Sequence, residues 1–531
     1  MLLPDDSIDM REHELHFHTA SNYDNPSLLV KPLSELTENE GDCRNTILLS
    51  CVYKEKIKEL VRPCDGLIST TVNRLAKIFD LKIKKARISR MEDNSSIDFI
   101  DYEKIQMKNF DAKNDMQIHL STSIVLSIKL NPPKILSLKT FPTSLLIVGC
   151  IIHATATYQF ADGMDIVWFR EVSQGSRVYS PIFSGPSFTP SLAEVGCRLK
   201  VYCTPWSKAD DKYQRGRTVS YTLPGFVEGR PTVFNKMVSF RRQFSDRICL
   251  EKQLKDKLNF RCCSYNILSE TYSTSKQAAK TYSYTSKENL FIEFRMQRVL
   301  DELLFYQADI VCLQECDDKT FHSYLAPILS SADHRYVAHY ANKDSGVTEG
   351  CACFVREDNL EVVRVLHLSL KAVLRSAGYL EGFYRLRPDL KDIIGGKLGM
   401  ICQILICRSK APGQTAGFLV LANTHLFYHP AAGYLRLLQM HAITSALERI
   451  VALLRRGKEP SEIDLDLEVT GQEDSSADLA IRLEDLDLKG SHPLSEPPLL
   501  EKVKVSVVIC GDLNSTPNAA VVEFLSRLII R

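Results

Sequence analysis

The chain has 531 residues, of which 44% are hydrophobic and 25% are charged, and its formal net charge is +1. This length predicts two or three domains, and a composition so close to the globular average excludes a fibrous or wholly disordered chain. Its sixteen cysteines are scattered through apolar runs without the paired spacing of a zinc site, which predicts reduced, buried thiols.

The N-terminal part divides by charge. Residues 1–53 are acidic and weakly periodic, which predicts a loosely ordered lead-in. A basic segment, 54–115, follows, and apolar residues from Leu67 to Phe79 recur in it at roughly helical spacing. This spacing predicts an amphipathic helix. Its basic face is interpreted first as an ordinary solvated surface, with an RNA contact as the alternative.

From 116 to 224 the chain consists of short β-type runs separated by Pro and Gly, which predicts an all-β domain. Cys150, Trp168 and Cys203 follow one another in the order found in immunoglobulin-like sandwiches. Single residues of these types are also ordinary core residues, so both interpretations stay open. The polar, basic stretch 225–258 is expected to be a linker.

From 259 to 531 strands and helices alternate, which predicts an α/β domain. An acidic stretch, 459–501, interrupts this pattern with thirteen acids against Arg482 and Lys489, for a net charge of −11. We expect a disordered, solvent-exposed insertion there, because like charges keep such a segment extended. The rest of the chain then carries about +12, the direction expected of a protein that meets a polyanion.

Polar residues directly follow four apolar strands of this domain. Strand ends and loops meet at one edge of an α/β sheet, so these residues are expected to lie together. Each one alone has a simpler explanation, since a strand-end Asn or Asp often begins a turn and a lone His is often a partly buried core residue. The four residues are Asn266, Glu315, His425 and Asp512.

These residue types supply the parts that phosphodiester hydrolysis requires, namely a hard cation, a base for water and donors for the phosphate oxygens. Glu315 can bind Mg²⁺, and Asp512 can orient and deprotonate water. His425, Asn266 and Asn514 can donate hydrogen bonds to phosphate, His425 best when it is protonated. The sequence therefore predicts a magnesium-dependent phosphodiesterase.

The motifs around these residues resemble the exonuclease-endonuclease-phosphatase superfamily in its deadenylase branch. They read YNIL at 265–268, LQE at 313–315, NTHL at 423–426 and GDLNS at 511–515. Within that branch, three longer stretches are similar to the mitochondrial 2′,5′-phosphodiesterases. These stretches are NTHLFYHPAAGYLRLLQM at 423–440, EGCACF at 349–354 and, in the β domain, VGCRLKVYCTP at 195–205.

The resemblance implies a two-layer β-sandwich flanked by helices, preceded by the all-β domain. It also implies a role for each residue of the constellation. Glu315 would bind the metal, Asp512 would activate water, Asn266 and His425 would contact the phosphate, and Asn514 would contact phosphate or base.

The same resemblance implies that Tyr428 and His429 lie near the substrate. It implies Mg²⁺ as cofactor and RNA as partner, with 3′-exonuclease action on 2′,5′-oligoadenylate and poly(A) tails. Separately, the sequence has no run of eighteen apolar residues, so we expect no membrane-spanning segment. The resemblance implies the mitochondrial matrix as the compartment, with the cytoplasm as alternative because the first residues lack the character of a presequence.

Members of the family end with a strand bearing Asp-Tyr and a terminal Ser-Asp-His, and neither occurs at the corresponding place before Arg531. We therefore expect a chain of this length to lack part of its sheet and to show little or no cleavage. The string Ala332-Asp333-His334 lies between a helix and a strand and is interpreted as a loop.

Two alternatives remain. One is another phosphoesterase of the same superfamily, such as a phosphatase or a sphingomyelinase, which would share the metal-binding and base residues. The other is a non-catalytic RNA-binding or regulatory protein that contains a degenerate nuclease domain.

Overall fold

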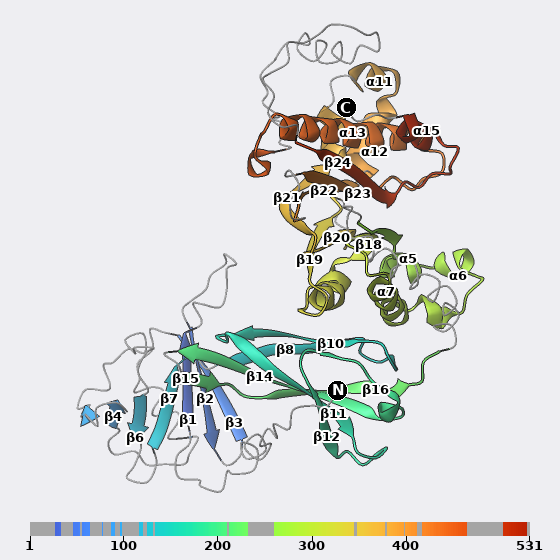
Figure 1. The fold of residues 1–531 in the computed structure, drawn as a ribbon. Coiled ribbons are helices and arrows are strands. Elements are labelled where there is room, and N and C mark those ends of the chain that lie inside the picture. The colour runs from blue at the N-terminus through green and yellow to red at the C-terminus, as the bar shows by residue number, and fades with distance from the viewer. Residues whose placement is uncertain are drawn as a thin grey trace. The chain divides into compact units, whose positions relative to one another are not determined.

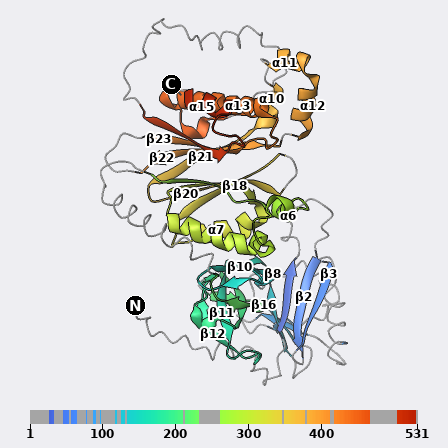
Figure 2. The same ribbon diagram turned by 90° about the vertical axis from the view of Figure 1, so that its right-hand side faces the viewer.

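The computed structural model divides the chain into two compact units, each described here by itself (Figures 1 and 2). The first unit comprises residues 1–139, 154–186 and 199–223, and the second comprises 140–153, 187–198 and 224–531. The structure describes residues 27–32, 46–53, 56–63, 77, 87–90, 96–97, 116–119, 125–130, 133–209, 212–231, 260–344, 348–376, 380–397, 399–410, 417–464 and 503–527.

A seven-stranded sheet with the order β3-β2-β1-β7-β6-β4-β5 lies in the N-terminal part. The expectation of a loosely ordered lead-in and a helical basic segment is wrong for these strands. TILLSCVY and KIKELVRP form a hairpin in which Tyr53 pairs with Lys56, because two apolar runs separated by two polar residues favour antiparallel pairing. The helix expected from Leu67 to Phe79 lies outside the described residues except for Lys77, which is helical. The strands are β1 (Ser27–Pro32), β2 (Thr46–Tyr53), β3 (Lys56–Pro63), β4 (Arg87–Arg90), β5 (Ser96–Ile97), β6 (Met116–His119) and β7 (Val125–Leu130).

The next part of the chain is all β, as expected. One sheet has the order β13-β10-β8, and another has the order β12-β11-β14-β16-β9 with β9 parallel to β16. This strand order resembles that of immunoglobulin-type sandwiches. The bounds are β8 (Lys134–Phe141), β9 (Leu146–Ile147), β10 (Ile152–Gln159), β11 (Gly163–Glu171), β12 (Tyr179–Ser184), β13 (Ser187–Phe188), β14 (Arg198–Ala209), β15 (Lys212–Arg215, on β14) and β16 (Val219–Glu228).

Cys150, Trp168 and Cys203, whose order resembles that of immunoglobulin-like sandwiches, lie in different surroundings. Trp168 on β11 is fully buried, and its Nε1 donates to the carbonyl of Gly185 at 3.0 Å. Cys203 is buried on β14 in the first unit, whereas Cys150 belongs to the second unit, where it packs against Phe294. Neither thiol is in a disulfide, so the cross-sheet bridge of antibody domains is not formed. The last strand also continues to Glu228, past the expected domain end at 224.

The second unit is built on two four-stranded sheets, β17-β18-β20-β19 and β21-β22-β23-β24. Their facing sides share one core, in which Cys312 and Val355 of the first sheet meet Leu405 and Leu421 of the second. The bounds are β17 (Cys262–Asn266), β18 (Ile310–Asp317), β19 (Tyr336–Asn342), β20 (Glu349–Arg356), β21 (Leu360–Ser369), β22 (Ile401–Ser409), β23 (Phe418–His425) and β24 (Val505–Asp512).

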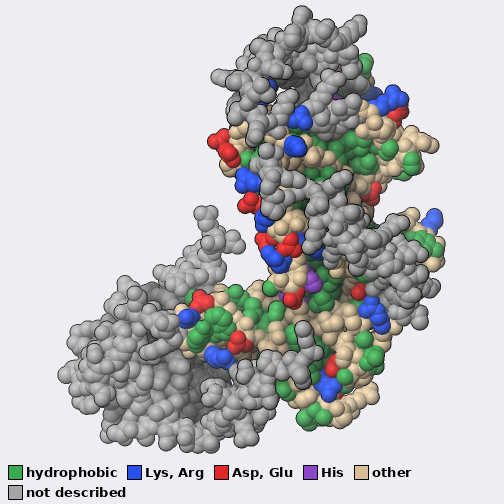
Figure 3. All heavy atoms as spheres, in the orientation of Figure 1, with side chains coloured by type: hydrophobic (Ala, Val, Ile, Leu, Met, Phe, Trp, Pro, Cys, Tyr) green, Lys and Arg blue, Asp and Glu red, His purple; other side chains and the backbone are tan. Residues whose placement is uncertain are grey.

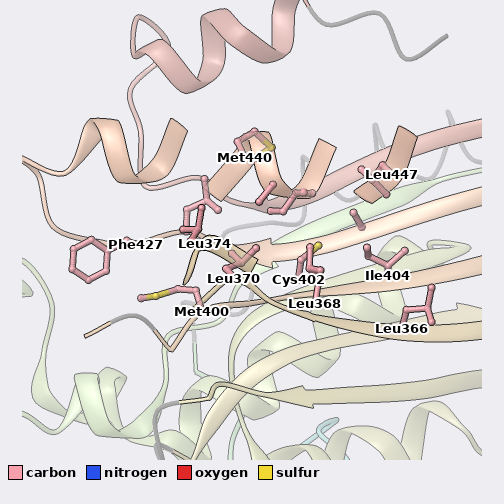
Figure 4. Packing of buried hydrophobic residues seen from close by; sticks show 14 of the residues in the cluster. Leu366, Leu368, Leu370, Leu374, Met400, Cys402, Ile404, Phe427, Met440 and Leu447 are labelled. Atoms are coloured by element: carbon pink, nitrogen blue, oxygen red, sulfur yellow. The ribbon is translucent and has the colours of Figure 1, made fainter. Parts of the chain in front are cut away.

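Helices cover the outer face of each sheet, which completes the expected sandwich flanked by helices. Leu300 and Leu303 of α7 (Ile292–Tyr306) pack against the first sheet. The second sheet packs against α10, α12, α13 and α15, and Figure 4 shows Leu374, Met440 and Leu447 over Cys402 and Ile404. The other helical segments are α5 (Glu270–Ser273), α6 (Ala278–Thr281), η5 (Lys287–Leu290), α8 (Asp318–Thr320), η6 (Phe321–Leu325), α9 (Ala326–Leu329), α10 (Leu370–Ser376), α11 (Glu381–Leu386), α12 (Pro388–Lys397), α13 (Gly433–Arg455), η8 (Pro460–Glu462) and α15 (Ala520–Arg527).

Burial on both faces explains why the central strands read as continuous apolar runs rather than alternating ones. In β22 seven consecutive residues from Ile401 are buried, and in β18 only Glu315 is partly exposed. Helix α13 is long and apolar enough to cross a membrane, but half of that apolar stretch is buried and it supplies core residues such as Ile443 and Ile450. We therefore interpret α13 as a core helix.

The start of the predicted acidic insertion belongs to the fold. Ile463 is fully buried, and its carbonyl accepts a hydrogen bond from Arg364 Nε at 3.2 Å. Residues 465–502 lie outside the described part. In the view of Figure 3, basic and acidic side chains are interspersed over the described residues. Among the described residues on that face, the basic side chains are therefore not gathered into one patch.

Candidate active site

Two parallel strand pairs bring the predicted residues to one edge of the sandwich. In the first sheet β17 runs parallel to β18, and Asn266 pairs with the residue before Glu315. In the second sheet β23 runs parallel to β24, and His425 pairs with Asp512. Because parallel strands end at the same edge, each sheet contributes two of the four side chains there.

The Asn266 side chain joins the two carboxylates. Its Nδ2 donates to Glu315 Oε1 and to Asp512 Oδ2, both at 2.9 Å, while its Oδ1 accepts from the backbone N–H of Leu268 at 3.0 Å. Both donors and the acceptor of one amide are thereby used. A carboxylate at this position could not donate, so the pattern requires an amide.

Glu315 reaches the site through an irregularity in its strand. The pairing of β18 with β20 shifts register between Leu313 and Cys316, and Glu315 has a positive φ of 54°. Such a bulge inserts residues into one strand and re-aims a side chain. The second oxygen of Glu315, Oε2, accepts from the backbone N–H of Ser269 at 3.1 Å, which fixes the carboxylate.

Asp512 is held by the turn that follows β24. Its Oδ1 accepts from the backbone N–H of Asn514 at 2.8 Å, and Asn514 Nδ2 donates to the carbonyl of Leu426 at 2.9 Å. Gly511 has a φ of 154°, and a Cβ there would lie 2.2 Å from the carbonyl oxygen of Thr424. The Asn514 side chain therefore contacts backbone, which ties the loop after β24 to the loop after β23.

His425 is almost fully buried, and its Nε2 lies 3.8 Å from Asp512 Oδ2. Burial lowers its pKa below 6.5, and the charge of Lys343 lowers it further, although Glu315 and Asp512 act in the opposite direction. The imidazole is therefore neutral near pH 7, contrary to the preference for a protonated ring. Within the described part of the chain its Nδ1 has no hydrogen-bond partner.

Sequence reasoning missed a second group of polar residues, Tyr272, Lys343 and Glu349, which hydrogen-bond to one another. Glu349 is buried, Lys343 Nζ donates to its Oε1 at 2.5 Å, and the hydroxyl of Tyr272 donates to the same oxygen at 2.7 Å. The positive charge of Lys343 lowers the pKa of His425, and the negative charge of Glu315 raises the pKa of Tyr272. Tyr272, Lys343 and Glu349 therefore lie close to the Glu315 and Asp512 carboxylates. The position of Lys343 directly after β19 was the available signal.

The two expected substrate contacts lie on the loop after β23. Tyr428 is 66% exposed, and its ring centroid lies 5.2 Å from that of Phe427. His429 is exposed, and its carbonyl accepts from the buried Arg436 at 2.7 Å. Both side chains are exposed, and the Arg436 guanidinium holds the backbone of the loop.

A second contact of Arg436 links this loop to the one after β24. Its Nε donates to Ser515 Oγ at 3.0 Å, and its Nη1 donates to the carbonyl of Phe427 at 3.2 Å. The buried guanidinium thus braces both loops that carry the second sheet's functional residues.

The donor set fits a hard divalent cation. Glu315 and Asp512 offer carboxylate oxygens held next to one another through a shared amide, and each keeps lone pairs beyond these hydrogen bonds. Mg²⁺ takes one or two carboxylates and keeps several waters. The two negative charges also favour a cation between or beside them.

The sandwich brings Asn, Glu, His and Asp side chains together at one edge. In sequence, the chain is similar to 2′,5′-phosphodiesterases and to CCR4-type 3′-5′-exoribonucleases. It is similar to 2′,5′-phosphodiesterase 12 of Mus musculus, with 24% identity over 443 residues that cover 78% of this chain and 61% of the relative. The Homo sapiens protein of the same name is 23% identical over 441 residues, with the same coverage.

A shorter match is to carbon catabolite repressor protein 4 homolog 2 of Arabidopsis thaliana, 31% identical over 205 residues that cover 36% of this chain and 33% of the relative. The chain spans about three fifths of the length of the 2′,5′-phosphodiesterases. No family model matches it.

Among solved structures, ANGEL2, a 2′,3′-cyclic phosphatase, aligns with a TM-score of 0.32 and 20% identity over 50% of this chain and 56% of its own. The human Nocturnin catalytic domain aligns with a TM-score of 0.32 and 18% identity over 51% and 69%.

Proposed function

We propose that the chain is a Mg²⁺-dependent RNA phosphodiesterase, a 3′-exoribonuclease that acts on 2′,5′-oligoadenylate and poly(A) tails. The observation that carries the proposal is the convergence of Glu315 and Asp512 on the amide of Asn266, with His425 beside them. Similarity to proteins named 2′,5′-phosphodiesterase and 3′-5′-exoribonuclease supports the class of substrate.

In this proposal Glu315 holds the metal ion, which when bound neutralises charge on the phosphate. Asp512 accepts a proton from the attacking water, because both of its oxygens are fixed by donors and its carboxylate lies at the partly exposed edge. The neutral His425 contacts the phosphate through one ring nitrogen. Asn266 orients the Glu315 and Asp512 carboxylates in addition to any contact it makes with the substrate.

The exposed loop after β23 would hold the nucleotide. Tyr428 offers a ring face for stacking on a base, a contact worth about 1–3 kcal/mol per base. His429, next to it, is placed for a contact with base or phosphate.

From the family resemblance we also propose the mitochondrial matrix as the compartment, which fractionation of cells that express the tagged native protein would test.

The test is hydrolysis of 5′-labelled adenylate oligomers with 2′,5′ or 3′,5′ linkages by the native full-length protein. We expect a ladder that shortens from the 3′ end, requires Mg²⁺, and is lost in Asp512→Asn but kept in the exposed control Asp389→Asn. Hydrolysis of inositol phosphates or sphingomyelin in place of RNA would overturn the substrate assignment. Salt-sensitive RNA binding without any hydrolysis would overturn the enzyme assignment in favour of a regulatory protein.

A further inference from the structure

The core between the two sheets contains a cluster of thiols that catalysis does not use. The sulfurs of Cys262 on β17, Cys312 on β18 and Cys510 on β24 all lie within 4.8 Å of one another. They come from three strands and from both sheets, so their spacing in the sequence does not predict that they lie together. Within the cluster the Sγ atoms of Cys262 and Cys510 are 3.3 Å apart.

Access distinguishes these thiols. Cys262 is exposed, Cys510 is 8% exposed, and Cys312 is fully buried. A second close pair, Cys312 and Cys353 with sulfurs 3.9 Å apart, is fully buried. A dissolved oxidant can therefore reach the pair of Cys262 and Cys510 from one side and cannot reach the other pair directly.

A thiophilic metal is the alternative occupant. Zinc in structural sites is tetrahedral and takes four protein ligands. The cluster supplies three, and Cys353 does not lie within 4.8 Å of all of them. The geometry therefore favours a pair of thiols over a closed metal site.

We propose that Cys262 and Cys510 form a reversible disulfide that joins the two sheets of the sandwich. A disulfide bond is about 2.05 Å long, so the two sulfurs must approach by about 1.3 Å. Strands β17 and β24 already lie against each other across the sandwich, which leaves this adjustment to side-chain rotation.

The oxidant is a hydroperoxide. The exposed Cys262 sulfur attacks the peroxide and loses its thiol proton, the O–O bond breaks, and a sulfenic acid forms at Cys262 while water or an alcohol leaves with that proton. The Cys510 sulfur then attacks the sulfenic sulfur, an S–S bond forms, and a second water leaves with the remaining thiol proton. Two thiols lose two electrons in total, and the peroxide gains them. A dithiol reductant reverses the reaction through a mixed disulfide.

The bond would lie close behind the active site. Cys510 precedes Asp512 by two residues on β24, and Cys262 precedes Asn266 by four on β17. Oxidation would thus fix the spacing of the two strands whose ends carry the amide and the base.

The experiment is peptide mapping of the native protein after reduction, removal of reductant, hydrogen peroxide treatment and alkylation of the remaining thiols. We expect one cross-link between the peptides that contain Cys262 and Cys510, and a protein lighter by two hydrogens before alkylation. Two fewer of the sixteen cysteines should alkylate, and dithiothreitol should restore both.

The adjacent Cys263 provides the matched control, because successive residues of a strand point to opposite faces and Cys263 packs toward α7. Cys263→Ser should keep the cross-link, and Cys262→Ser, at an exposed position that tolerates the change, should abolish it. A cross-link to Cys312, oxidation of Cys262 alone, or stoichiometric zinc that survives chelation and protects the thiols would each overturn the proposal.

Discussion

The two sheets of the second unit each aim one carboxylate at the same point, but by different means. Glu315 lies inside β18, and a bulge together with a positive φ turns it toward the edge. Asp512 ends β24, and a turn held by Asn514 and Gly511 fixes it. The first carboxylate is thus supported by strand on both sides, whereas the second depends on a loop. The turn that holds Asp512 should therefore be more sensitive to substitution than the strand that holds Glu315.

The largest expected effect separates the chemistry of the two carboxylates. Asp512→Asn should lower kcat by about 10³-fold at any Mg²⁺ concentration, because the base is lost. Glu315→Gln should lower activity by a similar factor at low Mg²⁺ and recover in part at high Mg²⁺, because it weakens metal binding. Steady-state kinetics of the native protein across a Mg²⁺ titration measures both. Equal rescue of the two variants would contradict the division of roles.

The second effect concerns the amide that joins the sheets. Asn266→Asp should lower kcat/KM by about 10²-fold, because a third carboxylate replaces two donated hydrogen bonds with repulsion. Thermal denaturation serves as the control for folding. A variant with wild-type activity would show that the hydrogen bonds donated by Asn266 do not organise the site.

The loop side is tested by Gly511→Ala. The added Cβ would meet the Thr424 carbonyl oxygen at 2.2 Å in a backbone conformation that suits only glycine, so the free energy of unfolding should fall by about 1–3 kcal/mol. Gly382→Ala on α11 is the control, because nothing lies within 4 Å of a Cβ there. Urea unfolding of both variants measures the difference. Equal stability would indicate that the turn relaxes freely.

Burial of His425 predicts a pH dependence of stability. Its folded pKa is lowered below the unfolded value of 6.5, so its contribution to stability is complete above pH 6.5 and is lost as the pH falls through the folded pKa. Wild type should therefore lose more stability than His425→Gln between a pH above 6.5 and one about a unit below it. Denaturant titrations at the two pH values measure this. Parallel losses would contradict a buried neutral ring.

The smallest effect lies on the side of the first sheet. Tyr272→Phe removes one hydrogen bond to Glu349, which keeps its pairing with Lys343, so stability should fall by about 1 kcal/mol and kcat by severalfold at most. Tyr284→Phe, an 82% exposed control, should change neither. A large loss of activity in Tyr272→Phe alone would assign its hydroxyl to the substrate.

The sequence indicated the second unit well because its central strands are apolar on both faces and end in polar residues. Asn266, Glu315, His425 and Asp512 were therefore visible as strand-end residues, and the structure brings all four together. The group of Tyr272, Lys343 and Glu349 was missed, because it forms between a helix, a loop and the first residue of a strand, which no local periodicity links.

Three further features could not be recognised from local sequence patterns. Lysine and arginine residues in β3 obscure the two β-type runs of the β2–β3 hairpin and the two-residue gap between them. The convergence of Cys262 and Cys510 depends on how two sheets face each other, and strand register within one sheet carries no such information. The pKa of His425 likewise depends on burial that residue type alone does not reveal.

Because one amide, that of Asn266, is hydrogen-bonded to a carboxylate from each sheet, the geometry of the site depends on the relative position of the two sheets. A core substitution that displaces one layer by about 1 Å would break the geometry at the edge without altering any residue there, and such a displacement can reduce a rate about 10²-fold. Variation at inward positions such as Leu405 or Leu421 should thus tune the catalytic rate from a distance.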